Sequence, residues 1–185
     1  MKKMKVFLCS VLLLFALVFA SVSAEASTNM MPVQLDGKVL SAEEFQRLDR
    51  HDIVVMAYVG ERLYAFTTET EFAQFRNRVE SETKRDVSIE VPHVGFYTHA
   101  KYKGESMGTI AHDPDLRRTF GGKFHDRISS LKVQCGVSLR IYEHINYKGA
   151  SLYFNSCSNN SNLSYVPKAG GGTWNDVISS YKVYR

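Results

Sequence analysis

The feature that most limits the fold of this chain is an internal repeat in its second half. The residues HDRISSLKV at 125–133 return as NDVISSYKV at 175–183, with six of the nine positions identical. A second pair precedes them, because YTHAKYKG at 97–104 matches YEHINYKG at 142–149. The second half of the chain therefore contains two copies of one structural unit. Two copies are too few to close a propeller, so they are expected to pack against each other.

The repeated segments have the pattern of short strands. From about residue 92 onward, alternating apolar and polar residues are separated by glycine-containing turns. Strands at this spacing predict an all-β sandwich with about four strands in each unit. The YxHxxYKG segments lie 45 residues apart and the DxISS segments lie 50 apart. The second unit therefore holds five extra residues, which we assign to the loops SNNSN at 158–162 and AGGG at 169–172.

A small α+β unit is predicted over residues 33–82, ahead of the repeat. An Asp-Gly pair within VQLDGKVL indicates a strand or short hairpin, and DIVVMAYVGERLYAFTT reads as two strands around a Gly-Glu turn. Ser41 with Glu44, and Thr68 with Glu71, have the spacing of capping boxes and predict two helices. The apolar face of the second helix is formed by Phe72, Phe75 and Val79. A unit of about 50 residues is too small to be robust alone, so we expect it to pack on the repeat. The polar stretch 81–86 is the expected linker.

The first 24 residues resemble a signal peptide of bacterial style. MKKMK is basic, VFLCSVLLLFALVFA is apolar, and SVSAEA offers small residues for cleavage after Ala24 or Ala26. The alternative is an uncleaved membrane anchor, for which the apolar run is short. We therefore predict a secreted or cell-envelope protein with no membrane attachment after cleavage.

The net charge and the cysteine count that matter are those of the chain without its predicted signal peptide, because that is the form expected after export. Removal of the signal lowers the formal net charge from +4 to +1, which gives no electrostatic case for nucleic acid as a partner. Cys135 and Cys157 then remain, and an even pair in an exported chain predicts a disulfide, with two free buried thiols as the alternative.

The repeated motifs resemble the microbial βγ-crystallins over about residues 93–185. The resemblance rests on an aromatic residue, four residues, an aromatic, one residue and a glycine, followed by (N/D)(N/D)xx(S/T)S, with both parts present twice. It implies a C-terminal domain at 92–185 made of two Greek keys, at about 93–134 and 136–185. It also implies that Ser130 and Ser180 hydrogen-bond the folded hairpins, whose glycines are Gly104 and Gly149.

The same resemblance implies two calcium sites, each taking ligands from both keys. Calcium is a hard cation that binds six to eight oxygen atoms, from carboxylates, carbonyls, hydroxyls and water. The implied side-chain ligands are Asp126, Ser129, Asp176 and Ser179. The implied backbone carbonyls are those of Arg127, Val177, Ala100 and Ile145. His125 departs from the first motif position, where the family has Asn or Asp.

Alternatives stay open for the two corners and for other metal-binding side chains in the repeat. Both corners can fold as hydrogen-bonded turns that bind no metal. His99 and His144 fall at equivalent repeat positions, which would suit zinc but is more typical of strand-end side chains. HDPDL at 112–116 reads as a turn around a proline rather than a site.

We predict that the protein is not an enzyme, since no catalytic arrangement is visible in the sequence. The leading hypothesis is a secreted calcium-binding protein with a structural, stress-related or binding role. The alternative is a secreted inhibitor of metallopeptidases, because FHDRISS and WNDVISS also resemble that inhibitor family, and a secreted protease would then be the partner. An exported toxin-like protein is a third reading.

Overall fold

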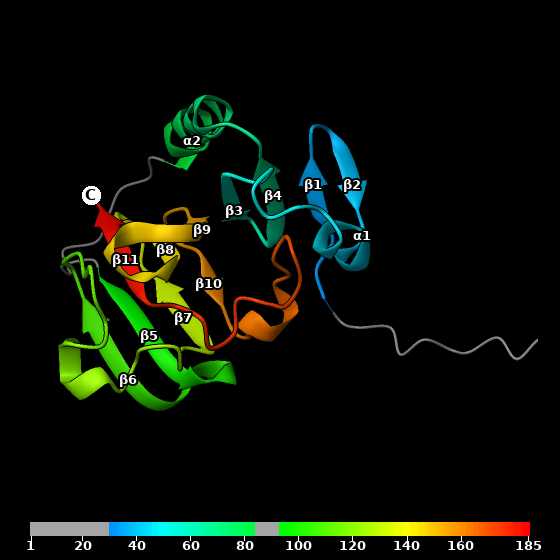
Figure 1. Cartoon of the computed structure of the whole chain (residues 1–185). Coiled ribbons are helices and arrows are strands. Elements are labelled where there is room, and N and C mark those ends of the chain that lie inside the picture. Colours follow the sequence, from blue (N-terminus) through cyan, green and yellow to red (C-terminus); the bar gives the residue numbers. More distant parts are fainter. Residues whose placement is uncertain (1–29, 84–92) are drawn as a thin grey trace, which may run out of the picture.

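The computed structural model describes residues 30–83 and 93–185. These residues form two β-sheets that face each other, with a long helix above one of them (Figure 1). The predicted signal peptide at 1–24 and residues 84–86 of the expected linker lie outside the described residues. The rest of that stretch, 81–83, is not a linker, because it forms the last turn of a helix.

Two sheets carry the repeat, as the sequence predicted. The four-stranded sheet has the order β10-β7-β5-β6, and the seven-stranded sheet has the order β11-β8-β9-β3-β4-β1-β2. The strands of the smaller sheet are β5 (Val94–His99), β6 (Lys103–Thr109), β7 (Ser130–Val133) and β10 (Asn159–Asn160). The repeat contributes β8 (Ser138–His144), β9 (Lys148–Phe154) and β11 (Ser180–Tyr184) to the larger sheet.

The two keys exchange segments. Strand β10 of the second key pairs antiparallel with β7 of the first, with Asn160 opposite Leu131. In return, Asp113 of the first key forms an antiparallel bridge with Tyr181 on β11. Each sheet therefore contains chain from both copies, which explains why neither copy is complete without the other.

Short 3₁₀ turns connect the strands of the repeat. Two of them, η1 (Ala100–Tyr102) and η3 (Ile145–Tyr147), sit at the tips of the equivalent hairpins β5–β6 and β8–β9. The others are η2 (Thr119–Gly122) and η4 (Leu163–Tyr165). At Gly104, with φ of 81°, an added Cβ would lie 2.4 Å from the Thr98 hydroxyl, so only glycine fits the hairpin there.

The N-terminal unit has the elements expected from its local patterns. Its strands are β1 (Val33–Leu35), β2 (Lys38–Leu40), β3 (Val55–Val59) and β4 (Arg62–Phe66). The Ser41 side chain and Glu44 form the predicted capping box of helix α1 (Ala42–Gln46). At the start of helix α2 (Glu69–Thr83), the Thr68 hydroxyl accepts from the Glu71 N–H at 3.2 Å. The predicted helices are therefore confirmed.

The N-terminal unit is joined to the second key by backbone pairing. Strand β3 runs parallel to β9, with Met56 opposite Leu152 and Tyr58 opposite Phe154. Strand β1 likewise runs parallel to β4. The larger sheet is consequently continuous from β11 at one edge to β2 at the other. The expected packing of the small unit on the repeat is confirmed, and it takes the form of an extension of a sheet.

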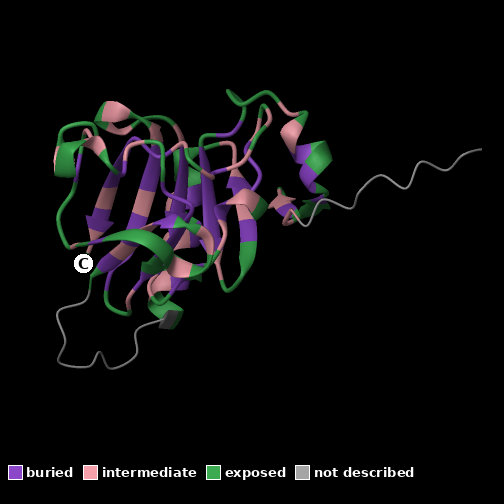
Figure 2. Ribbon diagram, turned by 90° about the horizontal axis from the view of Figure 1, so that it is seen from below, coloured by how far each residue is buried: buried purple, intermediate pink, exposed green. Residues whose placement is uncertain are grey.

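The main core lies between the two sheets, and a smaller one lies under α2. Figure 2 shows buried residues along the strands and exposed residues in the turns around them. The largest fully buried side chains include Trp174, Phe96, Phe154 and Phe45. Phe72, Phe75 and Val79 of α2 are buried with Tyr153 in the smaller core, as the helical pattern predicted.

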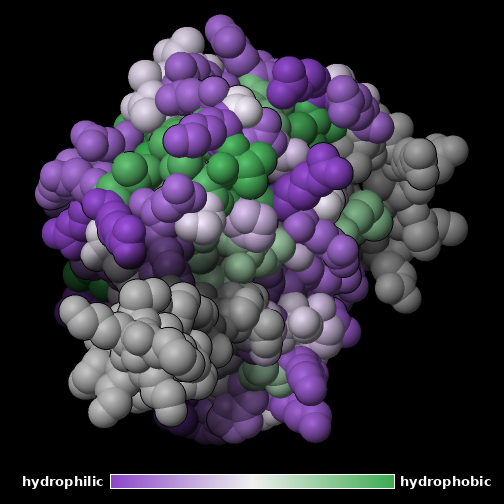
Figure 3. Space-filling view, turned by 90° about the vertical axis from the view of Figure 1, so that its right-hand side faces the viewer, coloured by the Kyte–Doolittle hydropathy of each residue, from purple (hydrophilic) through white to green (hydrophobic). Residues whose placement is uncertain are grey.

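The outer end of the larger sheet differs in surface character. On the side that carries β1, β2 and α1, apolar groups gather in a patch bounded by polar side chains (Figure 3). The last strand there, β2, has only three residues, and its Val39 is 66% exposed. A strand this short offers few unpaired backbone groups to another chain.

Cys135 and Cys157 form the predicted disulfide, which links residues 22 positions apart. It ties the connection between β7 and β8 to the segment that follows β9. Within the described ranges, no helix is both long and apolar enough to cross a membrane.

Candidate functional site

The two corners written twice in the sequence meet in the structure. Asp126 and Asp176 both adopt left-handed backbone, with φ of 51° and 55°. The N–H of Asp126 donates to the carbonyl of Ile178, and the N–H of Asp176 donates to the carbonyl of Ile128, each at 3.1 Å. The corners are thus clamped to each other by matching backbone hydrogen bonds, and the buried side chains of both isoleucines anchor them in the core.

Each corner presents its carboxylate to the serine of the other corner. The hydroxyl of Ser129 lies 3.0 Å from Oδ1 of Asp176, and the hydroxyl of Ser179 lies 2.9 Å from Oδ1 of Asp126. Both serines are buried, whereas both aspartates are exposed. The structure therefore brings together four predicted residues as two crossed pairs.

A backbone carbonyl completes each cluster of oxygen atoms. Thr98 O lies 3.0 Å from the hydroxyl of Ser129, and Glu143 O lies 2.8 Å from the hydroxyl of Ser179. The strand register shifts between Tyr97 and His99 and at the equivalent place in β8, so Thr98 and Glu143 sit at matching irregularities. A bulge re-aims the groups of the residue it contains, which explains why these two carbonyls face the corners.

The carbonyl assignments made from the sequence differ from this arrangement. Ala100 and Ile145 stand two residues later, at the start of η1 and η3. Sequence reasoning missed Thr98 and Glu143 because a carbonyl ligand has no side-chain signature. Their position at the end of matching strands was the available signal. Metal-binding roles for the carbonyls of Arg127, Val177, Ala100 and Ile145 stay predictions.

The first residue of each motif supports the aspartate that follows it. Asn175 Nδ2 donates to Oδ2 of Asp176 at 2.7 Å, and His125 Nδ1 lies 3.2 Å from Oδ2 of Asp126. In both corners Oδ2 of the aspartate contacts the first residue of the motif, and Oδ1 faces the serine of the other corner. The substitution of His for Asn or Asp at position one therefore preserves the orientation but places an ionisable ring beside one carboxylate.

The second serine of each motif has the structural role that the resemblance implied. The hydroxyl of Ser130 donates to His99 O at 2.6 Å and accepts from the N–H of Tyr102 at 3.0 Å. Ser180 makes the same two bonds to His144 O and the N–H of Tyr147. These serines hold the hairpins folded over the corners.

Glu143 also links its corner to a buried ion pair. Its carboxylate accepts a hydrogen bond from Lys168, and both side chains are largely buried. Burial by itself would raise the pKa of Glu143, but the hydrogen bond and the positive charge of Lys168 outweigh it and lower the pKa. The pair fixes the residue whose carbonyl meets Ser179.

The two repeat-related histidines pack on glycines. An added Cβ at Gly104 would lie 2.8 Å from the His99 ring, and one at Gly149 would lie 2.7 Å from the His144 ring. In residues 30–83 and 93–185, no three His, Cys, Asp or Glu side chains gather as a metal site. The crossed clusters differ from such a site, because each combines one carboxylate with a hydroxyl and a backbone carbonyl.

The same repeat is matched by a family model. The model for Beta/Gamma crystallin matches residues 90–182. The chain belongs to the βγ-crystallin family.

Solved structures of βγ-crystallins are similar to about half of the chain. A domain from Flavobacterium johnsoniae is 34% identical, with 49% of this chain and 91% of that one covered and a TM-score of 0.40. An archaeal βγ-crystallin is 27% identical, with coverage of 50% and 98% and a TM-score of 0.40. A domain from Clostridium beijerinckii is 26% identical, with coverage of 50% and 97% and a TM-score of 0.40. No curated protein matches the chain.

Proposed function

We propose that this βγ-crystallin binds two calcium ions, one at each crossed pair of corners. The first site would use Asp176, Ser129 and the carbonyl of Thr98, and the second would use Asp126, Ser179 and the carbonyl of Glu143. All of these donors are oxygen atoms, which calcium prefers. Bound calcium would supply the positive charge that joins the two keys.

One observation carries the proposal. Each serine hydroxyl lies within 3.0 Å of two acceptors, a carbonyl and a carboxylate. A hydroxyl has one hydrogen, so it satisfies one of the two and leaves lone pairs facing one another. A cation at this place relieves that repulsion, because the carboxylate, the hydroxyl oxygen and the carbonyl then all point at a positive charge.

The two sites should differ in strength. Asn175 donates a neutral hydrogen bond to Asp176, whereas the imidazole of His125 stands beside Asp126. With one carboxylate in each set, affinities in the range of weak sensors or extracellular modules are expected, roughly 10⁻⁶ to 10⁻³ M. The site at Asp176 is expected to bind more tightly, because its aspartate has no ionisable neighbour in the motif.

Calorimetric titration of the purified protein with calcium tests the proposal. Two unequal sites are expected, and Ser129→Arg or Ser179→Arg should each remove one, because the variant side chain brings a bulky cation into the cluster. Absence of any binding heat at millimolar calcium, together with an unchanged melting temperature, would show that the corners are structural turns only.

Export belongs to the same proposal. The basic and apolar N-terminal sequence supports it, and the disulfide between Cys135 and Cys157 is typical of proteins that mature in oxidising compartments. Mass spectrometry of the protein recovered from the culture medium is expected to find an N-terminus near Glu25 or Ser27. Recovery of the intact sequence from Met1 in the cell fraction alone would contradict export.

The inhibitor alternative can be separated from calcium binding with the same samples. A calcium response without inhibition of secreted metallopeptidases supports the proposed function. Inhibition that persists when both Asp126 and Asp176 are replaced by Asn would instead support the alternative predicted from the sequence.

A further inference from the structure

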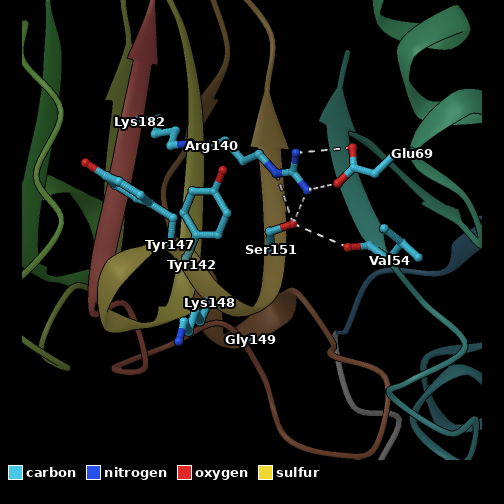
Figure 4. A pocket seen from close by; sticks show the side chains of 9 residues that line it. All are labelled: Val54, Glu69, Arg140, Tyr142, Tyr147, Lys148, Gly149, Ser151 and Lys182. Carbon is cyan, nitrogen blue, oxygen red and sulfur yellow. Dashed lines mark hydrogen bonds and ion pairs between the residues drawn. The ribbon is translucent and has the colours of Figure 1, made fainter.

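A polar pocket lies where the N-terminal unit meets the second key. It has a volume of about 480 Å³, within the range of small-molecule sites. Two lining residues come from the N-terminal unit, namely Val54 and Glu69. The others come from β8, β9, β11 and the hairpin tip, namely Arg140, Tyr142, Tyr147, Lys148, Gly149, Ser151 and Lys182 (Figure 4). None of the proposed calcium ligands lines this pocket, so it is a separate site.

Arg140 is the fixed centre of this pocket. Its guanidinium donates to the hydroxyl of the buried Ser151 at 2.9 and 3.0 Å, and lies 5.4 Å from the ring centre of Phe72 on α2. The same guanidinium donates to both carboxylate oxygens of Glu69, at 2.7 and 3.4 Å. The Arg140 side chain is 14% exposed, whereas that of Glu69 is 57% exposed. Arg140 is therefore held in place by Ser151 and Phe72, whereas the Glu69 side chain that pairs with it lies at the surface.

Tyrosines and lysines form the other side of the pocket. Lys182 Nζ lies 4.4 Å from the ring centre of Tyr147, and the Arg140 guanidinium lies 5.3 Å from that of Tyr142. With Lys148, the pocket has three cationic side chains against the single carboxylate of Glu69. Its charge is positive even with the internal ion pair formed, so it attracts anions.

The first key provides an internal comparison. Lys132 lies 4.5 Å from the ring centre of Tyr102, just as Lys182 lies over Tyr147. At the position 45 residues before Arg140, however, the first key has Gly95. The tyrosine and lysine arrangement is thus common to both keys, and the arginine is particular to the second. Arg140 therefore belongs to the junction with the N-terminal unit rather than to the Greek-key motif itself.

We propose that this pocket binds the carboxylate of a hexuronic acid, either as a free sugar or as a residue of an acidic polysaccharide. Glu69 shows that the exposed edge of Arg140 can donate two hydrogen bonds to one carboxylate, a geometry that adds both energy and specificity to the pairing. Val54 is the one aliphatic residue of the lining, and the amines of Lys148 and Lys182 and the hydroxyl of Tyr147 offer donors to a hydroxyl-rich ring. The ligand carboxylate displaces Glu69 toward solvent. The N-terminal unit then acts as one wall of a site.

The experiment is an NMR titration of the purified, isotope-labelled protein with D-glucuronate in metal-stripped buffer. D-glucose and inorganic phosphate serve as the neutral and the non-carboxylate controls. Arg140→Gln should weaken binding about tenfold or more, because charged hydrogen bonds are lost. Glu69→Gln should tighten binding about threefold or more, because the internal competitor loses its charge. Lys132→Gln removes the lysine of the first key that corresponds to Lys182 in the pocket, and it should leave the affinity within about twofold of wild type.

The gain expected for Glu69→Gln keeps the test decisive, since a misfolded variant does not bind more tightly. Tighter binding of a galacturonate oligomer than of D-galacturonate would place the ligand in a polymer, and equal binding would indicate the free sugar acid; both support the proposal. It is overturned if D-glucuronate shifts no pocket resonances in wild type and Glu69→Gln, if Arg140→Gln binds like wild type, or if glucose or phosphate binds as well as the uronate.

Discussion

Replacement of Asp176 by Asn isolates one calcium site with little damage to the fold. Asp176 has φ of 55°, and Asn is among the residues that tolerate left-handed backbone best. In the wild type the hydroxyl of Ser129 lies 3.0 Å from Oδ1 of Asp176, and the amide oxygen of the variant can accept the same hydrogen bond. The one contact at risk is the bond from Asn175 Nδ2 to Oδ2 at 2.7 Å, worth about 1 kcal/mol.

The expected magnitude follows from linkage. Calcium at about 100 times the Kd of the weaker Asp126 site stabilises the native state by about 2.7 kcal/mol through that site, and by at least as much through the tighter Asp176 site. Two sites therefore give at least about 5.4 kcal/mol, and Asp176→Asn should retain only the part contributed by the Asp126 site, which is half or less. At about 2–4 °C for each kcal/mol in a chain of this size, calcium should raise the Tm of wild type by at least about 11–22 °C and that of the variant by half as much or less.

Scanning calorimetry with and without calcium measures these shifts, and titration calorimetry counts the ions. Asp126→Asn is the matched control, because Asp126 has φ of 51° and faces the other serine. Each single variant should bind one ion and the double variant none. Trp174, the single tryptophan of the chain, is fully buried two residues before Asp176. Its fluorescence should therefore respond to calcium in Asp126→Asn and lose that response in Asp176→Asn.

Two results would refute this reasoning. The first is an Asp176→Asn protein that still binds two ions with the full wild-type shift, which would mean that the carboxylate is not a ligand. The second is an Asp176→Asn protein that is strongly destabilised without calcium, which would mean that the carboxylate holds the apo fold and that its contact with Ser129 is structural.

Three further predictions concern stability. Cys135→Ser should lower the free energy of unfolding by about 3 kcal/mol, measured by denaturant titration of the oxidised proteins, whereas an unchanged midpoint would show that the disulfide constrains nothing. Gly149→Ala should cost about 1 kcal/mol or more beyond Gly171→Ala, because both positions have positive φ but only at Gly149 would the new Cβ meet an imidazole ring at 2.7 Å; equal melting temperatures would contradict this. The pKa of Glu143 is lowered by Lys168, so the stability contributed by this carboxylate is present above its usual value of 4.5 and lost as the pH falls through the lowered value. Glu143→Gln should thus make the acid limb of the stability curve shallower, and an unchanged limb would exclude the pair as its source.

Much of the candidate site was visible in the repeat. Asp126, Ser129, Asp176 and Ser179 were identified because side-chain chemistry and spacing are written in the sequence. The carbonyls of Thr98 and Glu143 were not identified, since every residue has a carbonyl and only the irregular strand register turns these two toward the corners. The pocket around Arg140 was also missed, although the mismatch between Arg140 and Gly95 in otherwise equivalent positions was a usable signal.

The sequence by itself determined the local structure of this protein. Capping boxes start both helices and turn residues separate the strands, because each of these features depends on neighbours within a few residues. The repeated motif also identified the two Greek keys, through its resemblance to a known family. Tertiary structure alone decided which distant groups meet. The parallel pairing of β3 with β9, the approach of Thr98 O to Ser129, and the contact of Glu69 with Arg140 join residues far apart in the chain. Such contacts depend on how complete sheets pack and exchange strands, and backbone pairing between strands carries no residue-specific signature that a linear pattern can display.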